Sequence, residues 1–172
     1  MKIIKGVVLI FSILIVGLSC TDEKENLTNE EARIICNKYE QLWDEGNFSI
    51  AKEILDSSYI LYSPLFSEGI RGIDKLEEFI EGNSKTFSDF ELSVDSLYVK
   101  DNIIFSYWTI TGTNDGSLGE LPATCEEINI SGFAVSKVRD GKIYEERTFW
   151  NMLEFYQQLG FQLIPPVAEV KG

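Results

Sequence analysis

The feature that most constrains the fold is a change of hydrophobic period along the chain. Up to about residue 82 apolar side chains recur at helical spacing, whereas long β-rich runs follow from residue 90. These runs are residues 90–100, 102–114, 125–138 and 142–150. The short turns KDN and RDG join two pairs of runs as antiparallel hairpins. Helices at one end of a chain and antiparallel strands at the other predict an α+β domain.

The first half of the chain carries clear helix signals. Thr28 and Glu31 have the spacing of a capping box, and Gly46 ends the helix that they begin. Its apolar positions are Ile34, Ile35, Tyr39, Leu42 and Trp43. The other predicted elements are a helix over 48–55, a strand over 59–63, a helix over 73–82 and a last helix over 151–160. Asp74 and Glu77 predict a second capping box at the start of the third helix.

The strands carry apolar side chains on both faces. One face of the second and third runs carries Ile104, Trp108, Ile110, Ile128, Ile130 and Ala134. The opposite face carries Ile103, Phe105, Tyr107, Phe133 and Val135, with Phe149 on the fourth run. A sheet with one solvated face would alternate apolar with polar residues, so we expect both faces to be covered. The helices cover one, and we predict a homodimer through the other, with Arg147 near its edge.

The amino terminus predicts export. Lys2 and Lys5 flank the start of an apolar stretch, GVVLIFSILIVGLSC, which is short for a bilayer span and ends at Cys20. Ser19–Cys20 resembles a bacterial lipobox, which implies cleavage after residue 19 and lipidation of Cys20. We therefore expect a signal peptide over 1–19, a polar tether over 20–27 and a lipid-anchored protein of the bacterial cell envelope, on the periplasmic or surface side. An uncleaved anchor is the alternative.

Composition excludes several chemistries. The chain contains no histidine, so Ser-His-Asp and Cys-His arrangements and imidazole zinc sites are excluded. It also lacks CxxC, P-loop, GxSxG and calcium-loop motifs, and we predict neither a metal nor a cofactor. The net charge of −13 argues against nucleic acid as a partner. An oxidising compartment permits a Cys36–Cys125 disulfide, but the absence of a spacing pattern favours two unpaired, buried thiols.

Several segments between about residues 32 and 160 carry a family resemblance. They read YEQLWDEGNFSIAKEILDSSYILYSP, GIRGIDKLEEFI, YWTITGTNDGSLGELPAT and SGFAVSKVRDGKIYEERTFWNMLEFYQQLG. Together they resemble the SnoaL-like polyketide cyclases of the nuclear-transport-factor-2-like superfamily. The resemblance implies a cone: a strongly curved antiparallel or mixed sheet wrapped around about three helices, with a pocket inside. It places the domain over 28–160 and a tail over 161–172.

The positions of the family's catalytic groups hold other residues in this chain. The resemblance puts the base, an aspartate in family cyclases, at Thr148, and family histidines at Tyr62, Asn114 and Ala134. None of these side chains titrates near neutral pH, which proton transfer requires. We therefore expect the cone to bind a small apolar or amphipathic molecule without the family's aldol chemistry.

Glu146 is the candidate that keeps catalysis open. It lies two residues before Thr148 on the same strand face, about 6–7 Å away. In a dry pocket its pKa would be raised, and it could act with Tyr62 or Thr148 as the base of a cyclase- or isomerase-type enzyme. The alternative is that Glu146 forms hydrogen bonds or pairs with an arginine such as Arg71 or Arg147. A further alternative is an assembly module with a filled cone. The predicted pocket residues are Tyr39, Trp43, Tyr62, Trp108, Asn114, Glu146, Thr148 and Trp150.

Overall fold

The computed structural model describes residues 26–164, so the predicted signal peptide, Cys20 and the end of the tail lie outside the described residues. Four helices and six strands follow one another along this part of the chain. Their bounds are α1 Asn29–Asp44, α2 Ala51–Ile54, β1 Leu55–Ser63, β2 Phe66–Arg71, α3 Ile73–Thr86, β3 Glu91–Lys100, β4 Ile103–Thr113, β5 Glu127–Arg139, β6 Lys142–Trp150 and α4 Met152–Gln158.

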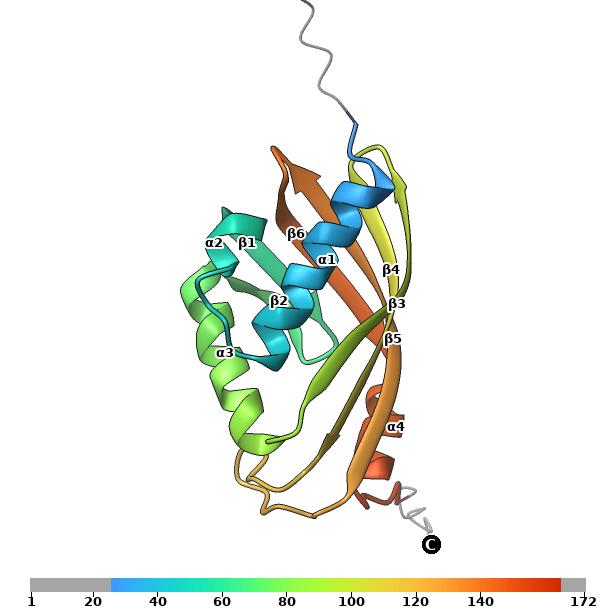
Figure 1. The fold of residues 1–172 in the computed structure, drawn as a ribbon. Helices are drawn as coiled ribbons and strands as arrows, with labels where there is room; N and C mark the ends of the chain where they lie inside the picture. Colours follow the sequence, from blue (N-terminus) through green and yellow to red (C-terminus); the bar gives the residue numbers. More distant parts are fainter. Residues whose placement is uncertain (1–25, 165–172) are drawn as a thin grey trace, which may run out of the picture.

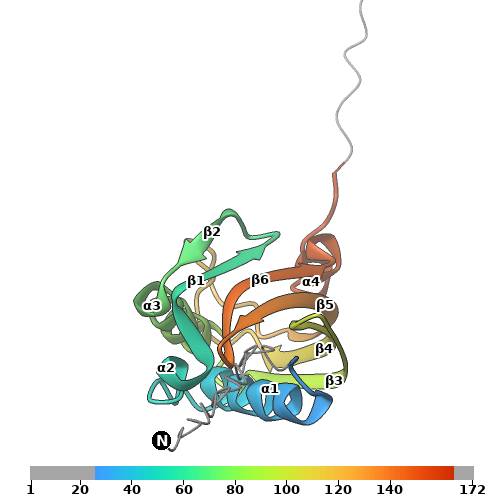
Figure 2. The ribbon, with the colours of Figure 1, turned by 90° about the horizontal axis from the view of Figure 1, so that it is seen from above.

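The strands form one curved sheet in the order β2-β1-β6-β5-β4-β3 (Figure 1). Neighbours pair antiparallel except β1 and β6, which run parallel. Seen from above, α1 lies beside β3 while α2 and α3 lie beside β1 and β2, so the helices close the concave side (Figure 2). The α+β prediction is confirmed: the sheet is mixed and open, and the helices pack on it.

Helix α1 is capped at its start and hydrogen-bonded to strand β3 along its length. The Thr28–Glu31 capping box is present, as predicted. Further along, Glu40 and Asp44 accept hydrogen bonds from backbone N–H groups of the edge strand β3, at 2.6 and 2.7 Å. Arg33 donates to a carbonyl of the same strand at 2.9 Å. These bonds satisfy polar groups that an edge strand leaves unpaired, and they hold α1 across the open side of the cone.

Several predicted boundaries in the first half are wrong. The second capping box is absent, because the N-cap of α3 is Gly72, which has a φ of 85° and no side chain that could cap the helix. This helix also continues to Thr86, beyond the predicted end. Helix α2 is a single turn, and β1 begins directly after it at Leu55. Strand β2 was not predicted, since its residues, FSEGIR, lack an apolar alternation.

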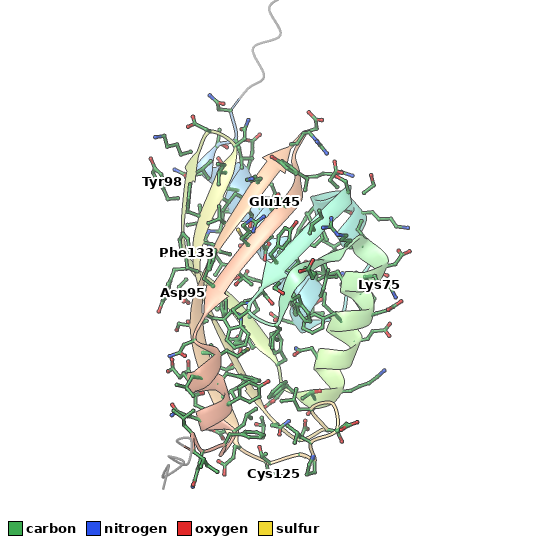
Figure 3. The ribbon with its side chains drawn as sticks, turned by 180° about the vertical axis from the view of Figure 1, so that it is seen from behind. Lys75, Asp95, Tyr98, Cys125, Phe133 and Glu145 are labelled. Atoms are coloured by element: carbon green, nitrogen blue, oxygen red, sulfur yellow. The ribbon has the colours of Figure 1, made fainter. Side chains whose placement is uncertain are left out.

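The two faces of the sheet differ in cover as well as in composition. The predicted parity is confirmed: Ile104, Trp108, Ile128 and Ile130 are buried on the concave side. On the other face large rings remain exposed: Tyr98, Tyr107, Phe133 and Phe149. Figure 3 looks onto this side and labels Tyr98 and Phe133. In the single described chain this face therefore presents an apolar surface to solvent.

The two cysteines of the described chain are both free. Cys36 is buried on α1, whereas Cys125 is exposed in the long loop before β5, so the prediction of two buried thiols holds only for Cys36. Cys125 has a φ of 59°, a conformation imposed by the turn in which its N–H donates to the Asn114 carbonyl. Within residues 26–164, no helix combines the length and the apolar character needed to span a membrane.

Candidate functional site

A cavity of about 810 Å³ lies inside the cone. Its walls are the concave face of β4, β5 and β6, the inner side of α1, and the carboxy-terminal half of α3, with α4 beside them. The lining residues at one end are exposed, namely Leu65 in the β1–β2 turn and Ser117 and Gly119 in the long loop, so this end is the mouth. At the other end Cys36, Ser136 and Glu146 are buried.

The register of β4, β5 and β6 arranges the inner side chains in rows from the closed end to the mouth. Glu146 lies opposite Ser136 in the first row. Thr148 lies opposite Ala134, which lies opposite Ser106, in the second. Trp150, Gly132 and Trp108 form the third row by the same pairing. Successive rows are about 6–7 Å apart, because side chains on one strand face recur every second residue. The cavity is therefore carboxyl-bearing at its end, hydroxyl-bearing next, and aromatic towards its mouth.

Gly132 shapes the aromatic row. A Cβ atom at this position would lie 2.2 Å from Cζ2 of Trp108, far inside any real contact distance. The Trp108 indole therefore lies directly against the backbone of β5, and glycine is the residue that permits this approach. Trp150 packs edge-on against Phe155 of α4, with ring centroids 5.5 Å apart. Both tryptophans thus have defined positions and leave the centre of the cavity open.

Glu146 is the polar centre of the closed end. Its two carboxylate oxygens accept hydrogen bonds of 3.2 Å from the hydroxyls of Tyr39 and Ser136. The side chain is buried, and no described lysine or arginine forms an ion pair with it. Burial raises the pKa of Glu146 to about 7, and the two hydrogen bonds only partly oppose this shift. The carboxyl group therefore changes its charge near neutral pH.

The groups around Glu146 are held in their neutral forms. Tyr39 and Tyr59 share a hydrogen bond of 3.1 Å between their hydroxyls. Burial, followed by the nearby Glu146 charge, raises the pKa of each phenol well above its usual value. The same two causes raise the pKa of the Cys36 thiol to about 12. At neutral pH Glu146 is consequently the group in this network that can exchange a proton.

Two polar atoms of the cavity wall have no hydrogen-bond partner within the described chain: Thr148 Oγ1 and Trp43 Nε1. Both are shielded from solvent, and a buried polar group without a partner costs free energy. Thr148 can donate or accept, whereas an indole N–H only donates. The cavity wall therefore offers two polar atoms that the described chain leaves without a hydrogen-bond partner, one on β6 and one on α1.

Six of the eight predicted pocket residues line the cavity: Tyr39, Trp43, Trp108, Glu146, Thr148 and Trp150. Tyr62 does not. It pairs with Arg147 across the parallel β1–β6 ladder and therefore points to the outer face, where the guanidinium lies 4.0 Å from its ring centroid. The placement of Tyr62 in the pocket is wrong, and so is its pairing with Glu146. The neighbour of Glu146 on β1 is Leu61.

Asn114 is also outside the cavity, although it is buried. Its amide nitrogen donates to the carbonyls of Thr86 and Gly116, at 3.3 and 2.9 Å. Its amide oxygen accepts from the backbone N–H and the hydroxyl of Thr124, at 2.9 and 3.0 Å. With all its hydrogen-bonding capacity directed at the backbone and loop, Asn114 ties the long loop to the end of α3 and shapes the rim of the pocket.

The suggested pairing of Glu146 with an arginine is wrong. Arg147 points away from the cavity and forms an ion pair with Glu145 at 3.1 Å. Sequence reasoning missed Ser106, Ser136 and Tyr59 as neighbours of this site. Ser106 and Ser136 share the parity of Trp108 and Ala134, so strand alternation could have identified them. Among residues 26–164, the side chains of Cys, Asp and Glu form no cluster of three that would hold a metal ion.

An open curved sheet closed by helices around an apolar cavity defines a cone-shaped pocket domain. Solved structures share this fold. TsrD from Streptomyces laurentii aligns with TM-score 0.70 and 20% identity over 78% of this chain and 98% of that one. AclR from Streptomyces galilaeus, named as a candidate hydroxylase, aligns with a TM-score of 0.67 and 21% identity over 81% of this chain and 88% of that one. A candidate SnoaL-like polyketide cyclase from Jannaschia sp. CCS1 aligns with a TM-score of 0.65 and 18% identity over 83% of this chain and 99% of that one.

The sequence comparison makes the assignment narrower. The family described as SnoaL-like polyketide cyclase matches residues 33–159, which is most of the chain. The protein therefore belongs to the SnoaL-like polyketide cyclase family. A comparison with curated proteins found no significant match. Because one fold of this kind carries unrelated activities, the reaction or ligand has to be argued from the site.

Proposed function

We propose that this protein binds a small apolar or amphipathic molecule in its cone and does not perform the aldol cyclisation of its family. The observation that carries the proposal is the cavity itself: about 810 Å³, apolar and aromatic over most of its wall, with polar groups only at defined positions. This volume is that of a drug-sized ligand. An assembly module with a filled cone would have no such space.

The proposed lack of aldol chemistry is supported by the side chains of the second row. Thr148 is the residue at the family's base position by resemblance, and its hydroxyl has no partner in the described chain that would activate it. Ala134 beside it offers a methyl group. The chain has no histidine to serve as a second proton-transfer group. Binding requires none of these groups, only apolar area and a few oriented polar atoms.

The test uses a substitution on β5 that fills the middle of the cavity. Ala134 is buried in the middle row, so Ala134→Phe directs a ring into the open space. We expect wild type to bind the neutral dye Nile red with a rise in its fluorescence, and Ala134→Phe to lose most of that binding while its circular dichroism is unchanged. Val135→Phe on the outer face is the matched control. Equal binding by wild type and Ala134→Phe would move the site out of the cone.

A second function is favoured by one observation: Glu146 is buried without a cation and has a pKa of about 7. That is the range in which a carboxylate can serve as a general base. The test compares the turnover of β-keto esters and of small enolisable ketones by wild type and by Glu146→Gln. Turnover by wild type that the glutamine variant lacks would make Glu146 the base and replace the binding proposal by an enzymatic one.

We also propose that the domain is held at the bacterial cell envelope by lipidation of Cys20, and that it forms a homodimer. The first rests on the apolar stretch and lipobox-like Ser19–Cys20 of the sequence. The second is supported by the exposed rings on the outer face of the sheet, which include Tyr107, Phe133 and Phe149. An exposed apolar surface of this kind is typical of an interaction site.

A further inference from the structure

The closed end of the cavity holds a carboxyl group that has no cation partner in the described chain. Glu146 is buried, its oxygens accept from two neutral hydroxyls, and the described chain supplies no cation to it. Placing a carboxylate in such surroundings is costly unless an opposite charge accompanies it. Protein cores usually avoid a buried carboxylate or pair it with a cation. A buried carboxyl that faces a cavity and has no cation partner among the described residues therefore points to a cationic ligand.

The titratable groups packed around Glu146 do not change this balance. Cys36 and Tyr39 face it from α1 and Tyr59 from β1, and all three stay neutral at physiological pH because their pKa values are raised. Strand β5 contributes the hydroxyl of Ser136. Arg33 of α1 is directed to a carbonyl of β3 at 2.9 Å. A cationic group of a ligand would therefore supply a positive charge that the described residues do not place beside Glu146.

We infer that the cone takes an elongated apolar molecule ending in a protonated primary or secondary amine, whose ammonium group lies between the Glu146 carboxylate and the Thr148 hydroxyl. The inference rests on the proposed binding function and names its ligand class. The two residues lie two positions apart on β6, about 6–7 Å along the strand. That spacing refers to the backbone, whereas one nitrogen with two hydrogen bonds of about 2.9 Å joins oxygens at most about 5.8 Å apart, so the longer Glu146 side chain has to extend towards Thr148 for the ammonium group to reach both.

Thr148 gives this arrangement its second support. Its Oγ1 is shielded from solvent and has no partner in the described chain. An ammonium group carries several N–H donors, so it can satisfy Thr148 as an acceptor while it pairs with Glu146. A quaternary ammonium has no N–H and would leave Thr148 unsatisfied. The free hydroxyl thus favours an amine that retains N–H groups.

The rest of the cavity suits the body of such a molecule. From the Glu146 row, the chain of the ligand would pass Ala134 and reach the aromatic row of Trp108 and Trp150. Trp43 on α1 lines the opposite wall. The net charge of −13 raises the local concentration of cations and opposes anions. A fatty acid or another anionic amphiphile would add a second negative charge beside Glu146 and is disfavoured.

Binding of the amine has a defined proton balance. The ammonium form enters with its proton, and its N–H groups donate to the Glu146 carboxylate and to Thr148 Oγ1. Where Glu146 is still protonated, its own proton passes to solvent, because the ion pair favours the carboxylate. Binding therefore releases protons near pH 7, and amine affinity rises with pH until Glu146 is fully ionised. A neutral ligand that accepts a hydrogen bond from protonated Glu146 would show the opposite sign.

The experiment compares three probes with one tail: phenylhexylamine, phenylhexanol and phenylhexanoate. Titration calorimetry of the purified protein in buffers of different ionisation enthalpy gives affinity and proton release together. At pH 8 we expect the amine to bind about tenfold or more tightly than the alcohol, since its hydrogen bonds are charge-assisted. From pH 6 to pH 8 the amine affinity should rise about tenfold, as a carboxyl with a pKa of about 7 ionises.

Variants assign the effect to the site. Glu146→Gln should remove the preference for the amine, its pH dependence and the proton release, while the alcohol still binds. Thr148→Val should weaken the amine several-fold and leave the alcohol unaffected. Glu127→Gln, at an exposed position of β5, is the control that should behave like wild type. Equal or tighter binding of the alcohol, or proton uptake with the amine, would overturn the inference but leave cone binding intact. If none of the probes binds, the proposed function fails as well.

Discussion

Replacing Glu146 by glutamine should change how the stability of the fold depends on pH. Burial raises the pKa of this carboxyl from its ordinary value of 4.5 to about 7. The folded protein therefore keeps a proton that the unfolded chain releases. The free energy of unfolding is unaffected by this group below pH 4.5, decreases as the pH rises from 4.5 to 7, and is constantly lower above 7. Glutamine has the same shape and no such titration.

The pKa difference sets the size of the effect. One unit corresponds to about 1.4 kcal/mol, so the full penalty above pH 7 is about 3 kcal/mol. Part of it is already present at pH 5, and the change between pH 5 and pH 8 is about 2 kcal/mol. Since a domain of this size is stable by roughly 5–15 kcal/mol, the change is measurable. Glutamine keeps acceptor capacity for Tyr39, and the Ser136 hydroxyl can rotate to accept from its amide.

The measurement is urea unfolding of wild type and Glu146→Gln at pH 5, 6, 7 and 8, followed by circular dichroism. The difference in the free energy of unfolding between the two proteins should shift by about 2 kcal/mol in favour of the variant as the pH rises across this range. Glu127→Gln, at an exposed position, controls for the loss of one acid from the chain. A difference that stays constant with pH, or that grows in favour of wild type, would show that Glu146 is ionised and well stabilised in the fold.

Four further predictions concern two glycines, the amino-terminal anchor and the outer sheet face. Gly132→Ala should destabilise the fold by about 1–3 kcal/mol in urea unfolding, because its Cβ would meet the Trp108 ring at 2.2 Å. Gly82→Ala in α3, where a Cβ meets nothing within 4 Å, should instead stabilise it by up to about 1 kcal/mol, and destabilisation there would contradict the reasoning. Cys20→Ala should move the protein out of the membrane fraction or leave residues 1–19 uncleaved; wild type recovered with residues 1–19 and no acyl mass would refute lipidation. Wild type should be a dimer by light scattering at micromolar concentration, and Phe133→Lys on the exposed sheet face should give a folded monomer. A monomeric wild type would remove the dimer proposal.

Much of the strand half of this protein follows from local pattern. Alternation along β4 and β5 correctly divides inward from outward residues, because the side-chain period of a strand is two wherever the ladder stays in register. The register shift between Lys137 and Val138 lies before the last turn, so Glu146 and Thr148 keep one parity. Helix α1 was predictable for a similar reason, since its capping box and apolar spacing involve only close neighbours.

The sequence by itself determined the α+β class, the inward set of side chains on the strands and the absence of imidazole chemistry, because residue type and strand or helix period are local properties. Tertiary structure decided which of these side chains meet. The parallel pairing of β1 with β6 turns Tyr62 to the outer face and brings Leu61 beside Glu146. The approach of α1 puts the Tyr39 hydroxyl on Glu146, and the loop after β4 uses Asn114 for its own backbone. The charge state of Glu146 depends on burial and on groups as distant along the chain as Tyr39, and such contacts arise only when the chain has folded.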